Sequence, residues 1–449
     1  MNFAIRHRRK VVRVLSYRAT GRGSFEKSER APGYLFQKKF GSRQKGLKMS
    51  SEGSNHVWGF STAGRIFFGW GAASVLRDVA REFGPRVFVC TDQNMVKAGV
   101  CETAVAQLTE GNAEVKIFDG GQPEVDRQTI ERAAAVGQTY APDVVIGLGG
   151  GSNLDLSKAV AILVKYPGPL SAYYGENNVP GPIAPVVAVP TTAGTGSEVS
   201  PVAVVADPER AMKVGIASRA LIPKWAIVDP ALTVSCPASV TAHSGMDALA
   251  HAIESFCARV RTDCSPHAIF VGKNPMSDVL ATKAISAIAQ FLPTAVAQPH
   301  DRAARQEMAL ASLLAGMAFS AAGTAAVHAL QYPVGEATHT PHGLGNAVLL
   351  PTVMRSITPS RIAEMAFIAR SLDPSLKSKA EADAAIQAAG LVEELAAKVG
   401  IPKGLRALGV KKEQLPQLSK MASTVRRLLD NSPVPFDESD LLRLLQEAF

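Results

Sequence analysis

Short apolar runs alternate with amphipathic stretches over the first half of the chain. Residues 73–83 and 125–139 place apolar side chains three and four positions apart, which is the spacing of a helix with one buried face. This alternation predicts βαβ units and a mostly parallel sheet covered on both faces. The predicted strands cover residues 65–72, 86–92, 114–121, 143–151, 186–192 and 226–230.

The pattern changes near residue 235, beyond which apolar residues recur only at helical spacing. The fold class predicted is therefore α/β plus all-α. A Rossmann-like, parallel-sheet, dinucleotide-binding domain is expected over residues 56–235 and an all-helical domain over 236–449, after an extension of residues 1–55. The predicted helices of the second half cover residues 240–260, 275–292, 302–319 and 381–399.

The positive charge of the chain is concentrated at its beginning. The whole chain has 48 basic and 39 acidic residues, and residues 1–50 hold 14 of the basic and 2 of the acidic ones. Residues 51–449 thus carry 34 basic and 37 acidic side chains, so this part is not basic and no nucleic-acid partner is expected. Three interpretations of the extension stay open: a disordered segment upstream of a true start at Met49, a transit peptide, or a nucleic-acid-binding arm.

Cysteine usage and hydropathy restrict the compartment. Five cysteines without a CxxC pair, Cys264 among them, are typical of a reducing compartment without a disulfide framework. Residues 308–335 contain no Asp, Glu, Lys or Arg and are long enough to span a bilayer. They are mostly Ala with interspersed Gly, Ser and Thr, so a buried helix in an α-helical core is favoured over a membrane span.

Two turns rich in small residues follow predicted strands. Residues 147–152 (GLGGGS) lie between a strand and a helix, where backbone N–H groups and the helix N-terminus favour a pyrophosphate. The spacing is not GxGxxG, so a plain tight turn is the alternative. In residues 190–201 (PTTAGTGSEVSP), Thr191, Thr192 and Thr195 offer hydroxyls to a cofactor or act as turn and cap residues. Asp92 ends a strand, where it either accepts ribose hydroxyls, favouring NAD over NADP, or caps the next helix.

One carboxylate and three imidazoles form a candidate metal site. Asp247 and His251 are four residues apart and share one face of a predicted helix. His328 lies in the uncharged stretch, where a buried imidazole needs a partner, and His342 precedes a glycine at a predicted helix start. The alternative for each residue alone is a core or loop histidine, but together they match the ligands of a divalent transition metal with room for a substrate oxygen. His339 is expected in a loop, and no partner is expected for His243 or His267.

Four motifs in this order resemble the iron-containing (group III) alcohol dehydrogenases: GGGSNLDLSK, PTTAGTGSEVSP, GMDALAHAIESF and HALQYPVGEATHTPHGLGNAVLLP. The resemblance implies the dehydroquinate synthase-like fold, an active site between the two halves, and a homodimer. It also implies that Asp247, His251, His328 and His342 hold Fe²⁺ or, in some relatives, Zn²⁺. The NAD contacts implied are Asp92, Gly149, Gly150, Gly151, Ser152, Asp155, Thr191, Thr192, Thr195, Ser200 and Lys213.

Some residues depart from the family pattern. Members often have a second histidine four residues after the third ligand, but this chain has Tyr332, so a proton relay there would use a phenol. Tyr332 and the loop around Cys264 to Lys273 are similar to the hydroxyacid-oxoacid transhydrogenase branch, which is mitochondrial in animals. HTPHGLGNAVLLP is closer to the bacterial alcohol dehydrogenases. Cytoplasm is therefore expected, with the mitochondrial matrix as the alternative.

The sequence thus predicts an NAD-dependent oxidoreductase acting on an alcohol, aldehyde or ketone. The substrate oxygen would bind the metal, a Lewis acid, while hydride passes to or from the nicotinamide, with His342 and Tyr332 as catalytic residues. Hydroxyacid-oxoacid transhydrogenation is the first alternative, with Arg259 and Arg261 as candidates for binding a carboxylate. A dehydroquinate-synthase-like lyase is disfavoured because no comparable set of basic residues accompanies the histidines.

Overall fold

A computed structural model describes residues 57–210, 213–262, 265 and 267–449. The extension of residues 1–55 and Cys264 therefore lie outside the described residues. Cys90, Cys101, Cys236 and Cys257 all carry free thiols. Within residues 57–235 the chain alternates between strands and helices, and beyond Ala238 the named elements are helices. The predicted fold class is confirmed, whereas the domain boundary near residue 235 stays a prediction.

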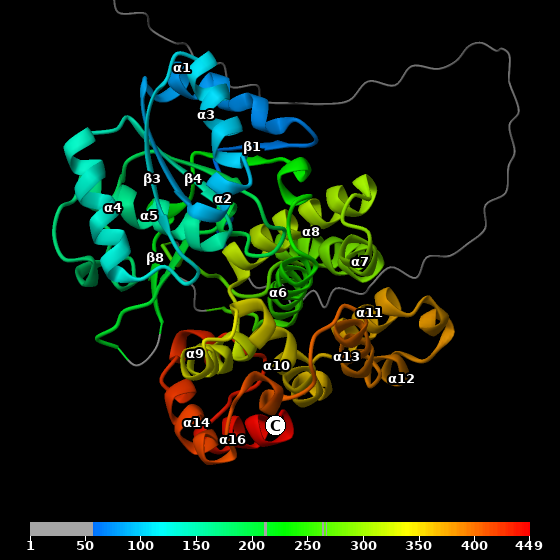
Figure 1. Ribbon diagram of the computed structural model, residues 1–449. Helices are drawn as coiled ribbons and strands as arrows, with labels where there is room; N and C mark the ends of the chain where they lie inside the picture. Colours follow the sequence, from blue (N-terminus) through cyan, green and yellow to red (C-terminus); the bar gives the residue numbers. More distant parts are fainter. Residues whose placement is uncertain (1–56, 211–212, 263–264, 266) are drawn as a thin grey trace, which may run out of the picture. The chain divides into compact units, whose positions relative to one another are not determined.

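Six strands form a parallel sheet in the order β1-β9-β6-β4-β2-β3 (Figure 1). Each predicted apolar run supplies one of them, because a run of four to eight apolar residues suits a strand buried on both faces. The strands are β1 Arg65–Phe68, β2 Arg86–Asp92, β3 Glu114–Gly121, β4 Val144–Gly149, β6 Val186–Pro190 and β9 Trp225–Val228.

Successive side chains of these strands enter two different cores, as the two-residue period of a strand requires. In β2, Phe88 packs with residues of α4 Arg127–Tyr140 and α5 Gly151–Lys165, whereas Val89 packs with residues of α3 Val100–Glu110. The predicted helix at 73–83 is a 3₁₀ helix, η1 Ala72–Asp78, followed by α1 Val79–Phe83. A short helix, α2 Gln93–Lys97, follows β2 directly.

A second, three-stranded sheet has no counterpart in the predicted elements. Its order is β5-β8-β7, with β5 Gly175–Glu176 and β8 Val214–Ala217 parallel and β7 Val202–Val205 antiparallel to β8. Strands of two to four residues are too short for a recognisable alternation of apolar and polar positions. This sheet matters for the site because Val202 and Val204 of β7 line the cavity that the four predicted metal ligands also line.

The second half is built from helices around a large core of Ala, Leu, Ile and Val side chains. Figure 1 shows α6, α7 and α8 packed side by side, and these helices contact one another extensively. The helices are α6 Ala238–Cys257, α7 Pro275–Ala297, α8 Arg302–Ala322, α9 Ala326–Thr338, α10 His342–Ile357, α11 Ile362–Leu372, α12 Glu381–Ala385, α13 Ala388–Lys398, α14 Leu415–Ser423, α15 Arg426–Leu429 and α16 Glu438–Glu447. Short 3₁₀ helices are η2 Leu170–Tyr173, η3 Ser197–Val199, η4 Arg219–Leu221, η5 Pro230–Thr233, η6 Thr358–Ser360, η7 Pro374–Ser378, η8 Leu405–Leu408 and η9 Lys412–Gln414.

Two predicted helices are each divided in the structure. The uncharged stretch 308–335 is not one helix but the end of α8 and most of α9, bent by 105°. The bend follows Gly323, whose φ of 84° favours glycine. The predicted helix 381–399 is α12 followed by α13, because the chain leaves regular helix between Ala385 and Ala388.

Within the described residues, α7 is long and apolar enough to cross a membrane, and the bent pair α8 and α9 passes the same test together. Both belong to the large helical core, where α7 packs against α6 and α8. Along α7, Ala281, Ile285, Ile288 and Leu292 are fully buried. Core helices meet the same length and composition criteria as membrane spans, so these matches carry no argument for a membrane.

The loop after β6 contacts the helical half through two glycines. A Cβ atom on Gly196 would lie 2.3 Å from the Cα atom of Gly316 in α8. Gly196 also has a φ of 62°, a conformation that other L residues adopt rarely. The backbone of the loop therefore contacts the backbone of α8 directly. Thr195, Ser197 and Ser200 of the same loop line a cavity.

Candidate functional site

Helix α6 supplies two of the predicted metal ligands. Asp247 and His251 are buried, with 2% and 5% of their surfaces exposed. The His251 ring stacks on the Phe319 ring with centroids 4.5 Å apart, and on the His328 ring at 4.8 Å. The Nδ1 atom of His251 lies 3.3 Å from the carbonyl oxygen of Gly194, in the loop after β6. Packing and a backbone acceptor thus set the orientation of this imidazole.

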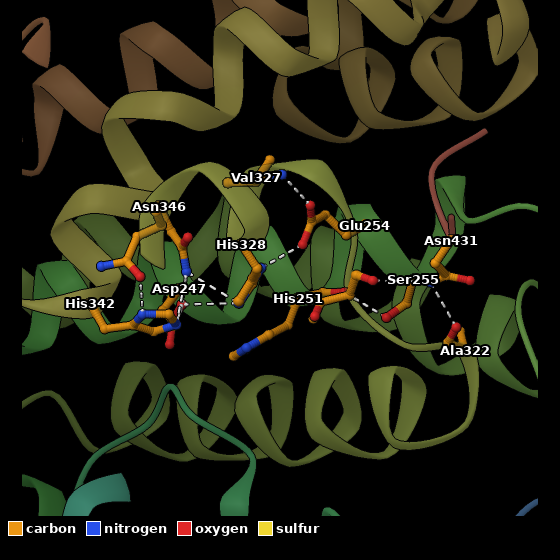
Figure 2. Close-up of polar contacts among 12 residues, drawn as sticks. Asp247, His251, Glu254, Ser255, Ala322, Val327, His328, His342, Asn346 and Asn431 are labelled. Atoms are coloured by element: carbon orange, nitrogen blue, oxygen red, sulfur yellow. Dashed lines mark hydrogen bonds and ion pairs between the residues drawn. The ribbon is translucent and has the colours of Figure 1, made fainter. Parts of the chain in front are cut away.

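His328 is held by a carboxylate from α6. Its Nδ1 atom lies 2.5 Å from Oε2 of Glu254, and Oε1 of Glu254 accepts a hydrogen bond from the backbone N–H of Val327 at 2.7 Å (Figure 2). Glu254 is three residues after His251, so both project from neighbouring positions of α6. One side chain therefore satisfies a free N–H at the start of α9 and orients the first histidine of that helix.

His342 is the first residue of α10, as predicted. Its Nδ1 atom lies 2.6 Å from Oε1 of Gln331, which belongs to α9. About a third of the His342 side chain is exposed, which makes it the most accessible of the four predicted ligands. Its open side faces the cavity that it lines together with Tyr332.

The ligand atoms converge on one point. One atom each of Asp247, His251 and His328 lie within 4.8 Å of one another. The Nε2 atom of His342 is 3.9 Å from Oδ1 of Asp247, and that of His328 is 4.0 Å from it. The amide nitrogen of Asn346 lies 2.8 Å from Oδ1 of Asp247 and 3.2 Å from both Nε2 atoms (Figure 2). An N–H₂ group that faces three acceptors marks the point where a cation would be attracted.

The protonation states fit a divalent metal. Burial lowers the pKa of the His251 imidazole, and lowers that of His342 to about 3, although the Asp247 charge opposes it in both. Burial opposes ionisation of Asp247, but the three imidazoles and the Asn346 amide hold its pKa below the usual range. Each imidazole has an acceptor at Nδ1, and in His328 and His342 the Nε2 atom faces the Asn346 amide. Three imidazole nitrogens and one carboxylate oxygen suit Fe²⁺ or Zn²⁺.

The glycine-rich turn is a strand-to-helix connection, as predicted. Gly149 ends β4 with a φ of 139°, and α5 begins at Gly151 after the cap residue Gly150. The N-terminus of this helix opens onto the cavity through Gly151 and Ser152, which places free N–H groups beside it.

One cavity joins the metal cluster to part of the predicted cofactor set. Its lining includes all four predicted metal ligands and Tyr332. The predicted cofactor residues that line it are Gly151, Ser152, Asp155, Thr195, Ser200 and Lys213. The remaining five, which do not line it, are Asp92, Gly149, Gly150, Thr191 and Thr192.

Asp92 caps the next helix, which was the alternative to a contact with ribose. Its Oδ1 atom accepts hydrogen bonds from the backbone N–H groups of Asn94 and Met95, which caps α2. Its Oδ2 atom accepts from the side-chain amide of Asn153 at 2.6 Å. The carboxylate is thus held beside the N-terminal part of α5, and a role toward ribose stays a prediction.

Several residues that shape the site were not predicted. Glu254, Gln331 and Asn346 orient the ligands, and their positions three or four residues from a ligand on the same helix could have identified them. Lys158 is fully buried in α5 and donates hydrogen bonds to Ser197 Oγ and Ser200 Oγ, at 2.9 Å and 3.2 Å. Burial lowers its pKa to about 8. Lys158 thereby fixes the loop that carries Ser200.

Comparison with known proteins assigns the family. Residues 63–230 match the model described as "Iron-containing alcohol dehydrogenase" and residues 241–449 that of the C-terminal part of the same family. The chain belongs to the iron-containing alcohol dehydrogenase family. It is similar to long-chain-alcohol dehydrogenase 1 of Geobacillus thermodenitrificans, 38% identical over 85% of this chain and 94% of the relative.

Two further matches concern the cofactor and the alternative activity. The crystal structure of a sulfoacetaldehyde reductase from Bifidobacterium kashiwanohense in complex with NAD⁺ superposes with a TM-score of 0.74 at 29% identity, over 87% of this chain and 98% of that one. The mitochondrial hydroxyacid-oxoacid transhydrogenase of Homo sapiens is 30% identical over 91% of this chain and 93% of the relative. The predicted family, oxidoreductase class, and pairing of NAD with a metal are confirmed.

Proposed function

We propose that this iron-containing alcohol dehydrogenase transfers hydride between NAD(H) and a small alcohol, aldehyde or ketone in the cavity between Ser152 and His342. In the oxidative direction the alcohol carbon loses a hydride to the nicotinamide and the hydroxyl loses a proton, so that a carbonyl compound, NADH and a proton result. The observation that carries the proposal is the common arrangement of His251, His328 and His342 around Asp247. Each has Nδ1 against an acceptor, and the Nε2 atoms of His328 and His342 lie 4.0 Å and 3.9 Å from Oδ1 of Asp247.

Asp247, His251, His328 and His342 would hold the metal, which when bound supplies a Lewis acid for the substrate oxygen. Glu254 and Gln331 keep two of these imidazoles in the tautomer that leaves Nε2 unprotonated. The His342 side chain, the most exposed of the four, faces the substrate space. These residues thus act by holding the metal-binding atoms in fixed positions before the substrate binds.

The nucleotide is assigned to the N-terminus of α5 and the loop after β6. Backbone N–H groups of Gly151 and Ser152, which follow the turn at Gly149 and Gly150, would face a phosphate there, and Thr195 and Ser200 line the same cavity. Lys213 forms an ion pair with Glu124 across the cavity lining, which places a donor beside the sugar or phosphate. Asp155 also lines the cavity, and its carboxylate accepts a hydrogen bond from Ser197 Oγ at 2.7 Å, so we assign it a role in supporting the loop that contacts the cofactor.

Tyr332 is assigned to the wall next to His342, with the ring centroids 6.3 Å apart. Burial raises the pKa of its phenol, although the nearby Arg427 charge opposes this. The phenol therefore stays protonated at neutral pH, so it can donate a hydrogen bond but does not accept a proton as a base. This limits the predicted relay role of Tyr332 to that of a donor.

The test is turnover by the purified chain loaded anaerobically with Fe²⁺ or with Zn²⁺. NAD would be supplied with a panel of primary alcohols, secondary alcohols and hydroxy acids, and NADH would be followed by absorbance. We expect metal-dependent NADH formation with at least one of them. Equal rates with and without metal, or no NADH from any, would overturn the proposal.

The transhydrogenase relative supports a second candidate. In that case NAD would stay bound and hydride would pass from a hydroxy acid to an oxo acid, so a hydroxy acid or alcohol alone would not reduce free NAD over many turnovers. We also propose that the protein forms a homodimer. We propose a location in the cytoplasm, or in the mitochondrial matrix if residues 1–48 are a transit peptide. Sedimentation and localisation of a tagged full-length chain test them.

A further inference from the structure

An arginine lines the cavity of the metal cluster together with aromatic side chains. Phe270, Phe319 and Tyr332 line this cavity, as does Thr324; Phe319 stacks on His251 and the Tyr332 ring lies next to that of His342. Arg427, from the short helix α15, lines the same cavity. A guanidinium therefore shares the cavity with the metal cluster.

The Arg427 side chain is oriented by two contacts. Its guanidinium carbon lies 4.8 Å from the centroid of the Phe270 ring, and Nε lies 3.4 Å from Oε1 of Glu176. About a third of the Arg427 side chain is exposed, as is 39% of that of Glu176. An ion pair at this exposure is weak, so its guanidinium N–H groups can serve a stronger acceptor.

The other charged groups of the cavity have closer partners. Lys213 is paired with Glu124, and both Asp155 oxygens accept hydrogen bonds, from Ser197 Oγ and the Val204 N–H. Asp247 lies among the imidazoles. Among the residues lining this cavity, Arg427 is therefore the charged group most able to receive an anion.

The charged side chains that line a wider hollow next to this cavity are mainly positive. Lys213, Tyr332 and Arg427 also line this hollow, in which Arg210 and Lys420 add positive charge and Glu176 is the acidic residue. Such a lining attracts anions toward the cavity. Arg259 and Arg261, the sequence-based candidates for a carboxylate, do not line the cavity of the metal cluster. They line an adjoining hollow, which shares Arg427, Phe270 and Thr324 with that cavity and also contains Glu176 and Asp430.

We propose that Arg427 binds the anionic end of the substrate, so that this enzyme prefers alcohols and aldehydes carrying a carboxylate a few carbons from the reacting oxygen. This inference rests on the function proposed above. The planar guanidinium matches a carboxylate with two parallel hydrogen bonds. The apolar wall between Tyr332 and Phe270 receives the intervening methylene groups, while the oxygen to be oxidised or formed points to the metal ligands.

The test compares two alcohols of similar length, 4-hydroxybutyrate and pentan-1-ol, with metal-loaded enzyme and NAD. The wild type is expected to have a higher kcat/KM for 4-hydroxybutyrate. In Arg427→Met the value for 4-hydroxybutyrate falls by about 10- to 100-fold, as expected for loss of a charged hydrogen bond. The value for pentan-1-ol and the KM for NAD change by less than about 3-fold, and Arg427→Lys, which keeps the charge without the fork, lies between the two.

Arg426→Met is the matched control. Arg426 is the neighbouring residue of α15, is paired with Asp430 at 2.6 Å, and lines the outer hollow but not the cavity. Its removal is expected to leave the ratio of the two kcat/KM values within about 3-fold of the wild type, because no direct contact is lost.

Each other outcome has a distinct meaning. A wild type that oxidises pentan-1-ol at least as well as 4-hydroxybutyrate overturns the inference and leaves the proposed function intact. An equal loss for both alcohols in Arg427→Met also overturns it, since that result assigns Arg427 a structural role or a role toward NAD. A wild type that oxidises neither alcohol nor any other member of the panel contradicts the proposed function itself.

Discussion

Around Asp247 the site is set by side chains, whereas around Ser152 it is set by the backbone. Each histidine of the metal cluster has its own acceptor, and Glu254 and Gln331 come from helices packed into the large core. On the nucleotide side the helix N-terminus of α5 and the glycine turn offer N–H groups, and Asp92 is already engaged in capping α2. A substitution can therefore remove a ligand or its acceptor at the metal cluster, whereas on the α5 side it leaves most backbone N–H groups in place.

This difference indicates which groups determine the affinity for each cofactor. A metal needs a few fixed donors of the right chemistry, so a single side chain can decide whether it binds. A pyrophosphate is bound by several backbone groups that no substitution deletes, so side chains there act mainly through shape. Substitutions of equal chemical size should therefore have larger effects at the metal cluster.

Asp247→Ala should have the largest effect. It removes the only carboxylate among the four predicted ligands, so metal content is expected to fall to background and kcat/KM by about 10³-fold or more. Elemental analysis and steady-state kinetics measure both, with Asp383→Ala, an exposed helical carboxylate, as control. Full turnover by metal-free Asp247→Ala enzyme would contradict the assigned ligand set.

Glu254→Ala should have the next largest effect, although Glu254 is not a predicted ligand. It removes the acceptor of His328 Nδ1 and the cap of Val327 N–H, so metal affinity is expected to fall about 10- to 100-fold. Competition with a chelator measures the metal affinity. The melting temperatures of the metal-free proteins show whether the substitution also destabilises the fold. Glu254→Gln, which keeps one acceptor oxygen, should recover part of the loss; an affinity equal to wild type in Glu254→Ala would remove Glu254 from the site.

Gly149→Ala tests the backbone side of the comparison. The φ of Gly149 is 139°, and a Cβ atom there would lie 2.1 Å from Nδ2 of Asn153. Strain of about 1–3 kcal/mol in the loop should raise the dissociation constant of NAD about 10-fold, with metal content unchanged. Gly390→Ala, at a position where an added Cβ meets nothing within 4 Å, is the control. Loss of metal in Gly149→Ala would show that the two sides are not independent.

Asp92→Asn should have the smallest effect. An asparagine still caps α2 through its oxygen, so folding is expected to be unchanged. Removing the negative charge should weaken NAD binding by only about 2- to 5-fold and should narrow the preference for NAD over NADP. Asp437→Asn, at the cap of α16, serves as the matched control. An unchanged ratio of the two cofactors would leave Asp92 with a capping role alone.

Much of this architecture could be predicted from local patterns. The six strands of the main sheet were recognisable because buried parallel strands are short apolar runs, and Asp247 and His251 because four residues span one helical turn. Bringing His328 and His342 to the same point needed the family resemblance, since the thirteen residues between them do not specify the turn from α9 to α10. The elements missed were those made by long-range contacts.

The second sheet and the role of Arg427 illustrate such contacts. β7 and β8 are four residues each, and β5 pairs with β8 about 40 positions further along the chain, which local patterns do not reveal. Arg427 is separated from His342 by 85 positions, so only the fold places it in the same cavity. In contrast, Glu254 and Asn346 lie within one turn of a ligand and could have been predicted by asking which residues share its face.

The contact between Gly196 and Gly316 has a consequence for the chemistry. The loop that carries it also carries Thr195 and Ser200 on the nucleotide side, and α8 carries Phe319, which stacks on His251. In the proposed reaction, the distance between the carbon that gives up hydride and the nicotinamide ring would therefore depend on a contact in which two backbones meet without side chains. A methyl group at either glycine would act as a wedge, and hydride transfer falls steeply once the reacting atoms are held even about 1 Å too far apart.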